Sequence, residues 1–208
     1  MTVAYQLINK IYLNITNECS CDCVFCLRNN IDGVGDASSL WLEREPTIDE
    51  IKLALDTKVR ELLPNHPEEI VFCGFGEPMI RADVVVSISE YIKEMYSSLY
   101  GRPAPLVRLN TNGLAFLMHP GFDVRRLSCV DVVSISLNAD DAKEFQRVAR
   151  PRYGEAAFGS MLDFAKEARG YTSVVFSVVE GTLSPERQGN CQVLADSLGV
   201  PLRIRPME

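Results

Sequence analysis

Three cysteines near the N-terminus have the type and spacing needed to hold iron. Cys19, Cys23 and Cys26 follow a C-x3-C-x2-C pattern, and an aromatic residue, Phe25, directly precedes the last of them. Three thiolates on one short loop can bind three irons of a [4Fe-4S] cluster. The fourth iron then has no protein ligand, so a second molecule can bind there.

Zinc is the main alternative for such a group of cysteines. A structural zinc site needs a fourth ligand, which usually comes from a second Cys or His pair further along the chain. Cys21 could supply this thiolate, although its C-x-C spacing to its neighbours is cramped, and His66 and His119 are not paired. The sequence has no second cysteine cluster and therefore predicts no auxiliary iron-sulfur cluster.

The composition is that of an ordinary globular protein. The 208 residues are 47% hydrophobic and 24% charged, and a net charge of −7 does not indicate binding to nucleic acid. No apolar stretch approaches the roughly 20 residues of a membrane span, and the N-terminal residues lack the features of a signal peptide. We therefore expect a cytoplasmic protein with reduced thiols, in which clustered cysteines indicate metal rather than disulfides.

Apolar, β-rich stretches alternate with helical patterns along the chain, which is typical of an α/β fold with a parallel sheet. Strands are predicted at 10–16, 69–75, 106–110, 130–137, 173–179 and 202–205, and helices at 47–63, 81–98, 119–127, 139–147, 155–169 and 185–197. Six strands are too few for a closed eight-stranded barrel. With right-handed crossovers, they are expected to curl into an open partial (β/α)6 barrel.

We expect residues 1–208 to form a single domain. Within it, residues 17–28 form the cluster loop, and residues 28–46 form a long loop that could act as a lid over a substrate. Long loops beside an active site often control access or recognise the substrate.

Glycines and polar residues gather where the predicted strands end, which is the edge that carries active groups in such folds. The second strand runs into Gly74-Phe75-Gly76-Glu77-Pro78, and the third ends at Asn110. Ser134, Ser136 and Asn138 alternate along the fourth strand, so their side chains share one face. Ordinary turns, caps and hydrogen bonds between strands remain alternative roles for these residues.

Two arginines, Arg203 and Arg205, share a face of the last predicted strand. A buried arginine needs an anionic partner. A ligand acid could supply it, and so could a carboxylate of the barrel, such as Glu180.

The cysteine loop and the strand-end motifs, in this order, resemble the radical S-adenosylmethionine (SAM) superfamily. The resemblance implies a [4Fe-4S] cluster on Cys19, Cys23 and Cys26, whose open iron binds the amino and carboxylate groups of SAM. An electron from an external donor of the flavodoxin or ferredoxin type then cleaves SAM to a 5′-deoxyadenosyl radical, which abstracts hydrogen from an unknown substrate. The implied SAM-binding residues are Phe25, Gly74, Gly76, Glu77, Asn110, Ser136, Asn138 and Arg205.

One subgroup of the superfamily is more similar than the rest. Ile15-Thr16-Asn17 before the first cluster cysteine, the long loop and the segment Leu40–Pro46 look like the small radical SAM proteins associated with TatD-family hydrolases. This resemblance implies a functional link to such a hydrolase and does not supply a substrate.

Two functions of other classes stay open. One is an activase that installs a radical on a partner protein, and the other is a zinc-stabilised binding protein without catalysis. Cys73 is a candidate hydrogen-atom donor if its side chain faces the barrel interior, and otherwise a small buried hydrophobe.

Overall fold

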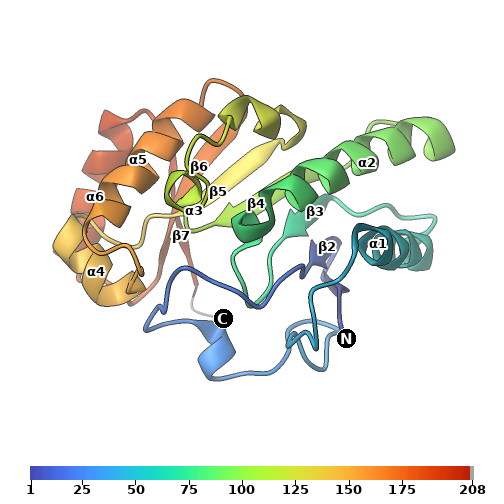
Figure 1. Cartoon of the computed structure of the whole chain (residues 1–208), viewed down its shortest axis with the longest axis horizontal. Helices are drawn as coiled ribbons and strands as arrows, with labels where there is room; N and C mark the ends of the chain where they lie inside the picture. The colour runs from blue at the N-terminus through green and yellow to red at the C-terminus, as the bar shows by residue number, and fades with distance from the viewer. Residues whose placement is uncertain (207–208) are drawn as a thin grey trace.

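Seven strands form a single sheet in the computed structural model, which describes residues 1–206 (Figure 1). Their order in the sheet is their order in the sequence, β1 to β7, and β1 does not pair with β7, so the barrel stays open. The strands are β1 (Ala4–Leu7), β2 (Lys10–Leu13), β3 (Glu69–Phe72), β4 (Leu106–Thr111), β5 (Val132–Ser136), β6 (Ser173–Val179) and β7 (Leu202–Arg205).

The predicted α/β class and open partial barrel are confirmed, with one strand more than the sequence indicated. The strands β2 to β7 are parallel and match the six predicted ones, whereas β1 is an additional strand that runs antiparallel to β2. The turn between β1 and β2 contains Ile8, whose φ of 57° lies in the left-handed region. It lacks the Asn-Gly or Asp-Gly pair that marks a hairpin in a sequence, which is why the pattern missed this strand.

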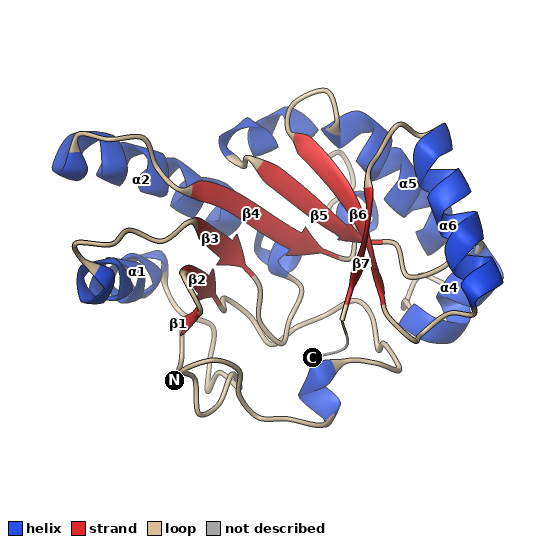
Figure 2. Ribbon diagram, turned by 180° about the vertical axis from the view of Figure 1, so that it is seen from behind, coloured by secondary structure: helices blue, strands red, loops and turns tan. Residues whose placement is uncertain are grey.

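The helices lie outside the curved sheet, with α1 and α2 near its β1–β4 part and α4, α5 and α6 near β5–β7 (Figures 1 and 2). Thr47 caps α1 through a capping box with Glu50, as the sequence predicted, and Ser184 caps α6. The α-helices are α1 (Ile48–Leu62), α2 (Ala82–Tyr100), α3 (Ala115–Met118), α4 (Ala142–Ala149), α5 (Ala156–Ala168) and α6 (Pro185–Ser197). Short 3-10 helices are η1 (Leu27–Asn29), η2 (Pro78–Arg81) and η3 (Val124–Cys129).

The helix predicted at residues 119–127 was wrong. The chain forms the single turn α3 before this segment and the 3-10 helix η3 at its end. Pro120 and Gly121 interrupt the helical pattern between them, and Gly121 has a φ of 83°, which a right-handed helix cannot accommodate.

Alternation along the strands separates a buried outer layer from a polar inner wall. On β4, Val107 and Leu109 are fully buried under the helices, whereas Arg108 and Asn110 face the barrel interior. The same period of two on β5 places Ser134 and Ser136 on the inner wall. Within residues 1–206, no helix is both long and apolar enough to span a bilayer.

Candidate functional site

A cavity of about 360 Å³ occupies the barrel interior. All seven strands contribute inward side chains to it, and the cysteine loop forms another part of its wall. The cysteine loop and the loop that follows it run across the side of the sheet at which the strands end (Figure 1). The predicted cluster loop and the predicted strand-end residues therefore meet around one space.

The cysteine loop is fixed by contacts to two distant elements. Its backbone runs beside the end of α4: Cys21 forms a β-bridge with Pro151, and the amide of Val24 donates to the carbonyl of Val148 at 2.9 Å. On the other side, the Nδ2 amide of Asn112 donates to Ser20 Oγ at 2.9 Å and lies 3.6 Å from Cys21 Sγ. The loop thus has a defined position before any ligand binds.

The donor set fits a cluster held by three thiolates. Cys19, Cys23 and Cys26 all line the cavity, as predicted. Cys21 lines it as well, and hydrogen bonds to Cys19 and Cys23, with burial, raise the pKa of the Cys21 thiol. The same hydrogen bond from Cys21 lowers the pKa of Cys19 to about 6, which favours the thiolate there.

The arrangement of these thiols differs from that of a site for one ion. Among residues 1–206, no three Cys, His, Asp or Glu side chains are grouped so that they could hold a single metal ion. A [4Fe-4S] cluster does not need such a group, because each of its cysteines binds a different iron.

The two glycines after β3 are required by packing within the protein. A Cβ atom on Gly74 would lie 2.1 Å from Asn14 Oδ1, and one on Gly76 would lie 2.3 Å from the carbonyl oxygen of Thr16. Both contacts are to the segment between β2 and the cysteine loop. The glycines therefore bring the end of β3 against the start of the cysteine loop, which the sequence motif did not reveal.

Glu77 joins three parts of the site. Its buried carboxylate accepts hydrogen bonds from Thr111 Oγ1 and the amide of Asn112, both at 2.7 Å, and from the amide of Met79 at 2.9 Å. Its own amide donates to the carbonyl of Glu18 at 2.7 Å. Burial, with the nearby charge of Cys19, raises the pKa of Glu77 to about 7. Glu77 is thus a positioning residue that ties the ends of β3 and β4 to the cysteine loop.

The other predicted SAM contacts also line the cavity, but they differ in what they bond. Asn110 and Ser136 make no side-chain hydrogen bond to the described part of the chain. Asn138 is almost fully buried with a φ of 49°, and its Oδ1 accepts from the amide of Val179 at 3.2 Å. Asn tolerates this left-handed conformation better than most residues. Asn138 therefore joins β5 to β6 with one side-chain atom.

Three further predicted residues face the same space. Phe25 packs partly against the hydrophobic core and also lines the cavity. Arg205, at the end of β7, lines the cavity too. Cys73 faces inward as well, and the hydroxyl of Tyr5 donates to its carbonyl at 3.3 Å. Asn112 was missed by the sequence analysis, because only the fold brings the turn after β4 to the cysteine loop.

The long loop at 28–46 lies against β1, β2 and α1. Asp36 accepts from the amide of Gln6 at 2.6 Å and pairs with Lys58 at 2.7 Å. Further along, Leu42 and Asn17 exchange two hydrogen bonds, of 2.7 and 3.0 Å. Buried Leu40 also lines the cavity. The part of the loop from Asp36 onward is thus held against β1, α1 and the segment after β2, and Leu40 brings it to the cavity wall.

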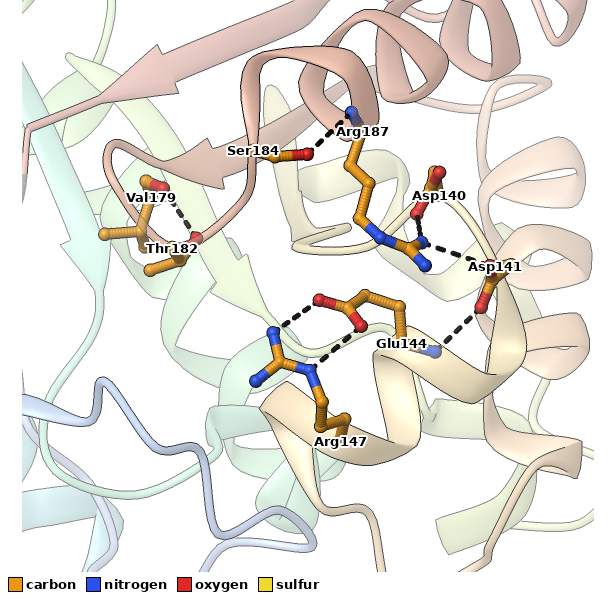
Figure 3. Close-up of polar contacts among 8 residues, drawn as sticks. All are labelled: Asp140, Asp141, Glu144, Arg147, Val179, Thr182, Ser184 and Arg187. Atoms are coloured by element: carbon orange, nitrogen blue, oxygen red, sulfur yellow. Dashed lines mark hydrogen bonds and ion pairs between the residues drawn. The ribbon is translucent and has the colours of Figure 1, made fainter.

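The loops that follow β5 and β6 are tied together by charge (Figure 3). Arg187 of α6 binds Asp140 and, at 3.1 Å, Asp141, which in turn caps α4 through the amide of Glu144. These bonds raise the pKa of Arg187. The ion pairs of Arg187 with Asp140 and Asp141 thus hold together the loops after β5 and β6. They also fix α4, which supports the cysteine loop.

Several solved structures share this fold. Streptococcus suis SuiB bound to its precursor peptide SuiA superposes with a TM-score of 0.68 at 13% identity, over 96% of this chain and 39% of SuiB. The enzyme anSMEcpe with bound AdoMet gives 0.65 at 15% identity, over 95% of this chain and 50% of that one. HydG from Carboxydothermus hydrogenoformans, an FeFe-hydrogenase maturase, gives 0.57 at 14% identity, over 96% and 44%.

All three neighbours are radical SAM enzymes, and this chain has their fold. It spans about two fifths to one half of the length of these proteins. No protein-family model and no curated protein matches the sequence.

Proposed function

We propose that this chain is a radical SAM enzyme, in which Cys19, Cys23 and Cys26 hold a [4Fe-4S] cluster and SAM binds beside it. When bound, the cluster and SAM would supply a 5′-deoxyadenosyl radical, formed by one-electron cleavage of SAM, that abstracts hydrogen from a substrate. The observation that carries the proposal is the meeting of a three-thiolate loop with the strand-end residues around one cavity.

The residues of the chain divide the remaining work between them. Glu77 and Asn112 hold the cysteine loop in place, while Asn110, Ser136 and Arg205 keep polar groups directed into the cavity. The enclosing strands and the loop segment from Asp36 to Pro46 limit the access of water to the reacting groups. An external one-electron donor of the flavodoxin or ferredoxin type would supply the electron.

Anaerobic reconstitution tests the metal site. Cys19→Ser, Cys23→Ser and Cys26→Ser should each abolish cluster iron and SAM-dependent formation of 5′-deoxyadenosine, because each removes the ligand of one iron. Cys21→Ser is the matched control and should keep both, since Cys21 lies outside the C-x3-C-x2-C spacing. A colourless wild-type protein that binds one zinc would exclude the proposal in favour of the zinc-stabilised binding protein.

The activase remains a second candidate, favoured by the peptides bound to two of the neighbours. SuiB was solved with the precursor peptide SuiA, and anSMEcpe with the peptide Kp18Cys. If this chain installs a radical on a partner protein, 5′-deoxyadenosine should form stoichiometrically and only when that partner is present. Co-purification with a TatD-family hydrolase would test the functional link that the subgroup implies.

A further inference from the structure

Cationic side chains outnumber carboxylates in the cavity wall outside the cysteine loop, although the protein is acidic. The whole chain carries a net charge of −7. Among the described residues that line the cavity, however, five side chains are cationic and only two are carboxylates, namely Lys10, Arg28, Arg108, Arg203 and Arg205 against Glu69 and Glu77. A surplus of positive charge in a concave site attracts anions and concentrates them there.

Most of these charges already have partners in the protein. Glu69 lies between Lys10 and Arg108 and binds each at 2.7 Å, and Arg28 lies 4.0 Å from Asp22. The arginines of β7 are different: within residues 1–206, no carboxylate lies within ion-pair distance of Arg203 or Arg205.

SAM does not neutralise both of these arginines. The molecule has one carboxylate against an ammonium and a sulfonium, so it brings net positive charge into the cavity. Arg205 lies at the end of β7, opposite Val179, and can serve that one carboxylate. Arg203 lies two residues earlier on this edge strand, where it lines the cavity but is exposed to solvent, opposite Ser177 on β6, and that serine is paired with Ser136 on β5. Two serines thus lie beside Arg203 on the inner wall, and a SAM carboxylate bound by Arg205 would leave Arg203 available to a second anion.

We infer that the substrate carries an oxyanion, a carboxylate or a phosphate, and that Arg203 binds it. Arginine suits this role because its planar guanidinium can donate two parallel hydrogen bonds to either group. The rest of the substrate would face the apolar part of the wall, which includes Tyr12, Leu40 and Val71. That the bound molecule is a substrate rests on the proposed radical SAM function, whereas the anion site itself rests only on the charges described above.

Calorimetry on the full chain tests the anion site without enzymatic turnover. Inorganic phosphate and succinate are titrated separately, at matched ionic strength, into the wild type, Arg203→Gln, Arg203→Lys and Arg125→Gln. Arg125 is the control, because it is an exposed arginine outside the cavity that pairs with Asp123. Circular dichroism melts confirm that each variant is folded, and the titration is repeated with the reconstituted, SAM-bound protein.

At least one anion should bind the wild type, and the tighter one identifies the chemical class of the substrate group. Arg203→Gln should weaken this binding by about tenfold or more, while Arg203→Lys should retain most of it and Arg125→Gln all of it. The inference is overturned if neither anion binds, or if binding is the same in Arg203→Gln and the wild type. Loss of the cluster or of SAM binding in the wild type would instead contradict the proposed function and leave the anion titration as an independent result.

Discussion

The β3–β4 end of the site and its β7 edge treat their polar groups in opposite ways. At the first, Glu77 and Asn112 form hydrogen bonds to other parts of the protein, and a Cβ on Gly74 or Gly76 would meet the Asn14 side chain or the Thr16 backbone. At the second, Arg203 and Arg205 reach into the cavity without a carboxylate partner in the described chain. Glu77 and Asn112 therefore position the site, whereas Arg203 and Arg205 are the residues that we expect to meet ligands.

Among the variants that test this comparison, Gly76→Ala should lower the stability of the protein most. The added methyl group would lie 2.3 Å from the carbonyl of Thr16 and 2.6 Å from that of Glu18, so it would push the cysteine loop away. We expect a loss of about 3 kcal/mol in the free energy of unfolding and poor cluster reconstitution. In contrast, Gly159→Ala on α5, where a Cβ meets nothing within 4 Å, should stabilise the protein by about 0.5 kcal/mol. Urea denaturation measures both; equal stability of the two variants would contradict the packing role of Gly76.

Glu69→Gln should have the next largest effect, because it leaves Lys10 and Arg108 without their shared carboxylate. Burial by itself raises the pKa of Glu69, but the hydrogen bonds from Arg108 and Lys10 outweigh it and lower this pKa. We expect the variant to lose about 2 kcal/mol of stability at neutral pH, since two cations lose their partner.

The pH dependence of the Glu69 effect has a definite sign. A lowered carboxyl pKa stabilises the folded state above the unfolded value of about 4.3, and this stabilisation is lost as the pH falls through the folded pKa. The stability gap between wild type and Glu69→Gln should therefore narrow in acid. Urea denaturation across this acidic range measures the stability gap. A gap that widens toward low pH would show that the ion pairs of Glu69 with Lys10 and Arg108 are not its source.

Asn112→Ala and Asn110→Ala form a matched pair on the same strand end. Asn112 bonds to Ser20 and to the amide of Leu114, so its truncation should cost about 1–2 kcal/mol and weaken the cysteine loop. Asn110→Ala should leave stability within about 0.5 kcal/mol, because the side chain makes no hydrogen bond to the described chain. Thermal melts and SAM titrations separate the two. A lower melting temperature of Asn110→Ala with unchanged SAM affinity would contradict the expectation that polar groups without a protein partner serve ligands rather than stability.

Arg205→Gln should have the smallest effect on stability and a clear effect on SAM. With no protein partner to lose, its melting temperature should match the wild type, while SAM affinity should fall by about tenfold. Arg205→Lys provides the charge-retaining control and should bind SAM more tightly than the glutamine variant. Unchanged SAM affinity in Arg205→Gln would assign this arginine to the substrate or to structure.

The sequence was sufficient for the features that depend on local pattern. The spacing of Cys19, Cys23 and Cys26 and the alternation on β5 are visible within a few residues, and the fold follows from the order of such segments. It was insufficient for features that arise between distant segments. Asn112 meets Ser20 across 92 positions, and Gly74 and Gly76 pack against the segment that follows β2. The SAM-binding roles, including that of Phe25, and the role of Cys73 as a hydrogen-atom donor stay predictions.

The sequential order of the strands determines the order in which the parts of the fold can form during synthesis. From β2 onward, each strand finds its partner already synthesised, so the sheet can grow from one edge as the ribosome proceeds. The cysteine loop is synthesised early but cannot form its contacts to Asn112 and to the backbone at 148–151 at once, because these residues follow more than 80 positions later. Strand β7 is made after both of these supports, so the cysteine loop can dock before the β7 edge of the cavity forms.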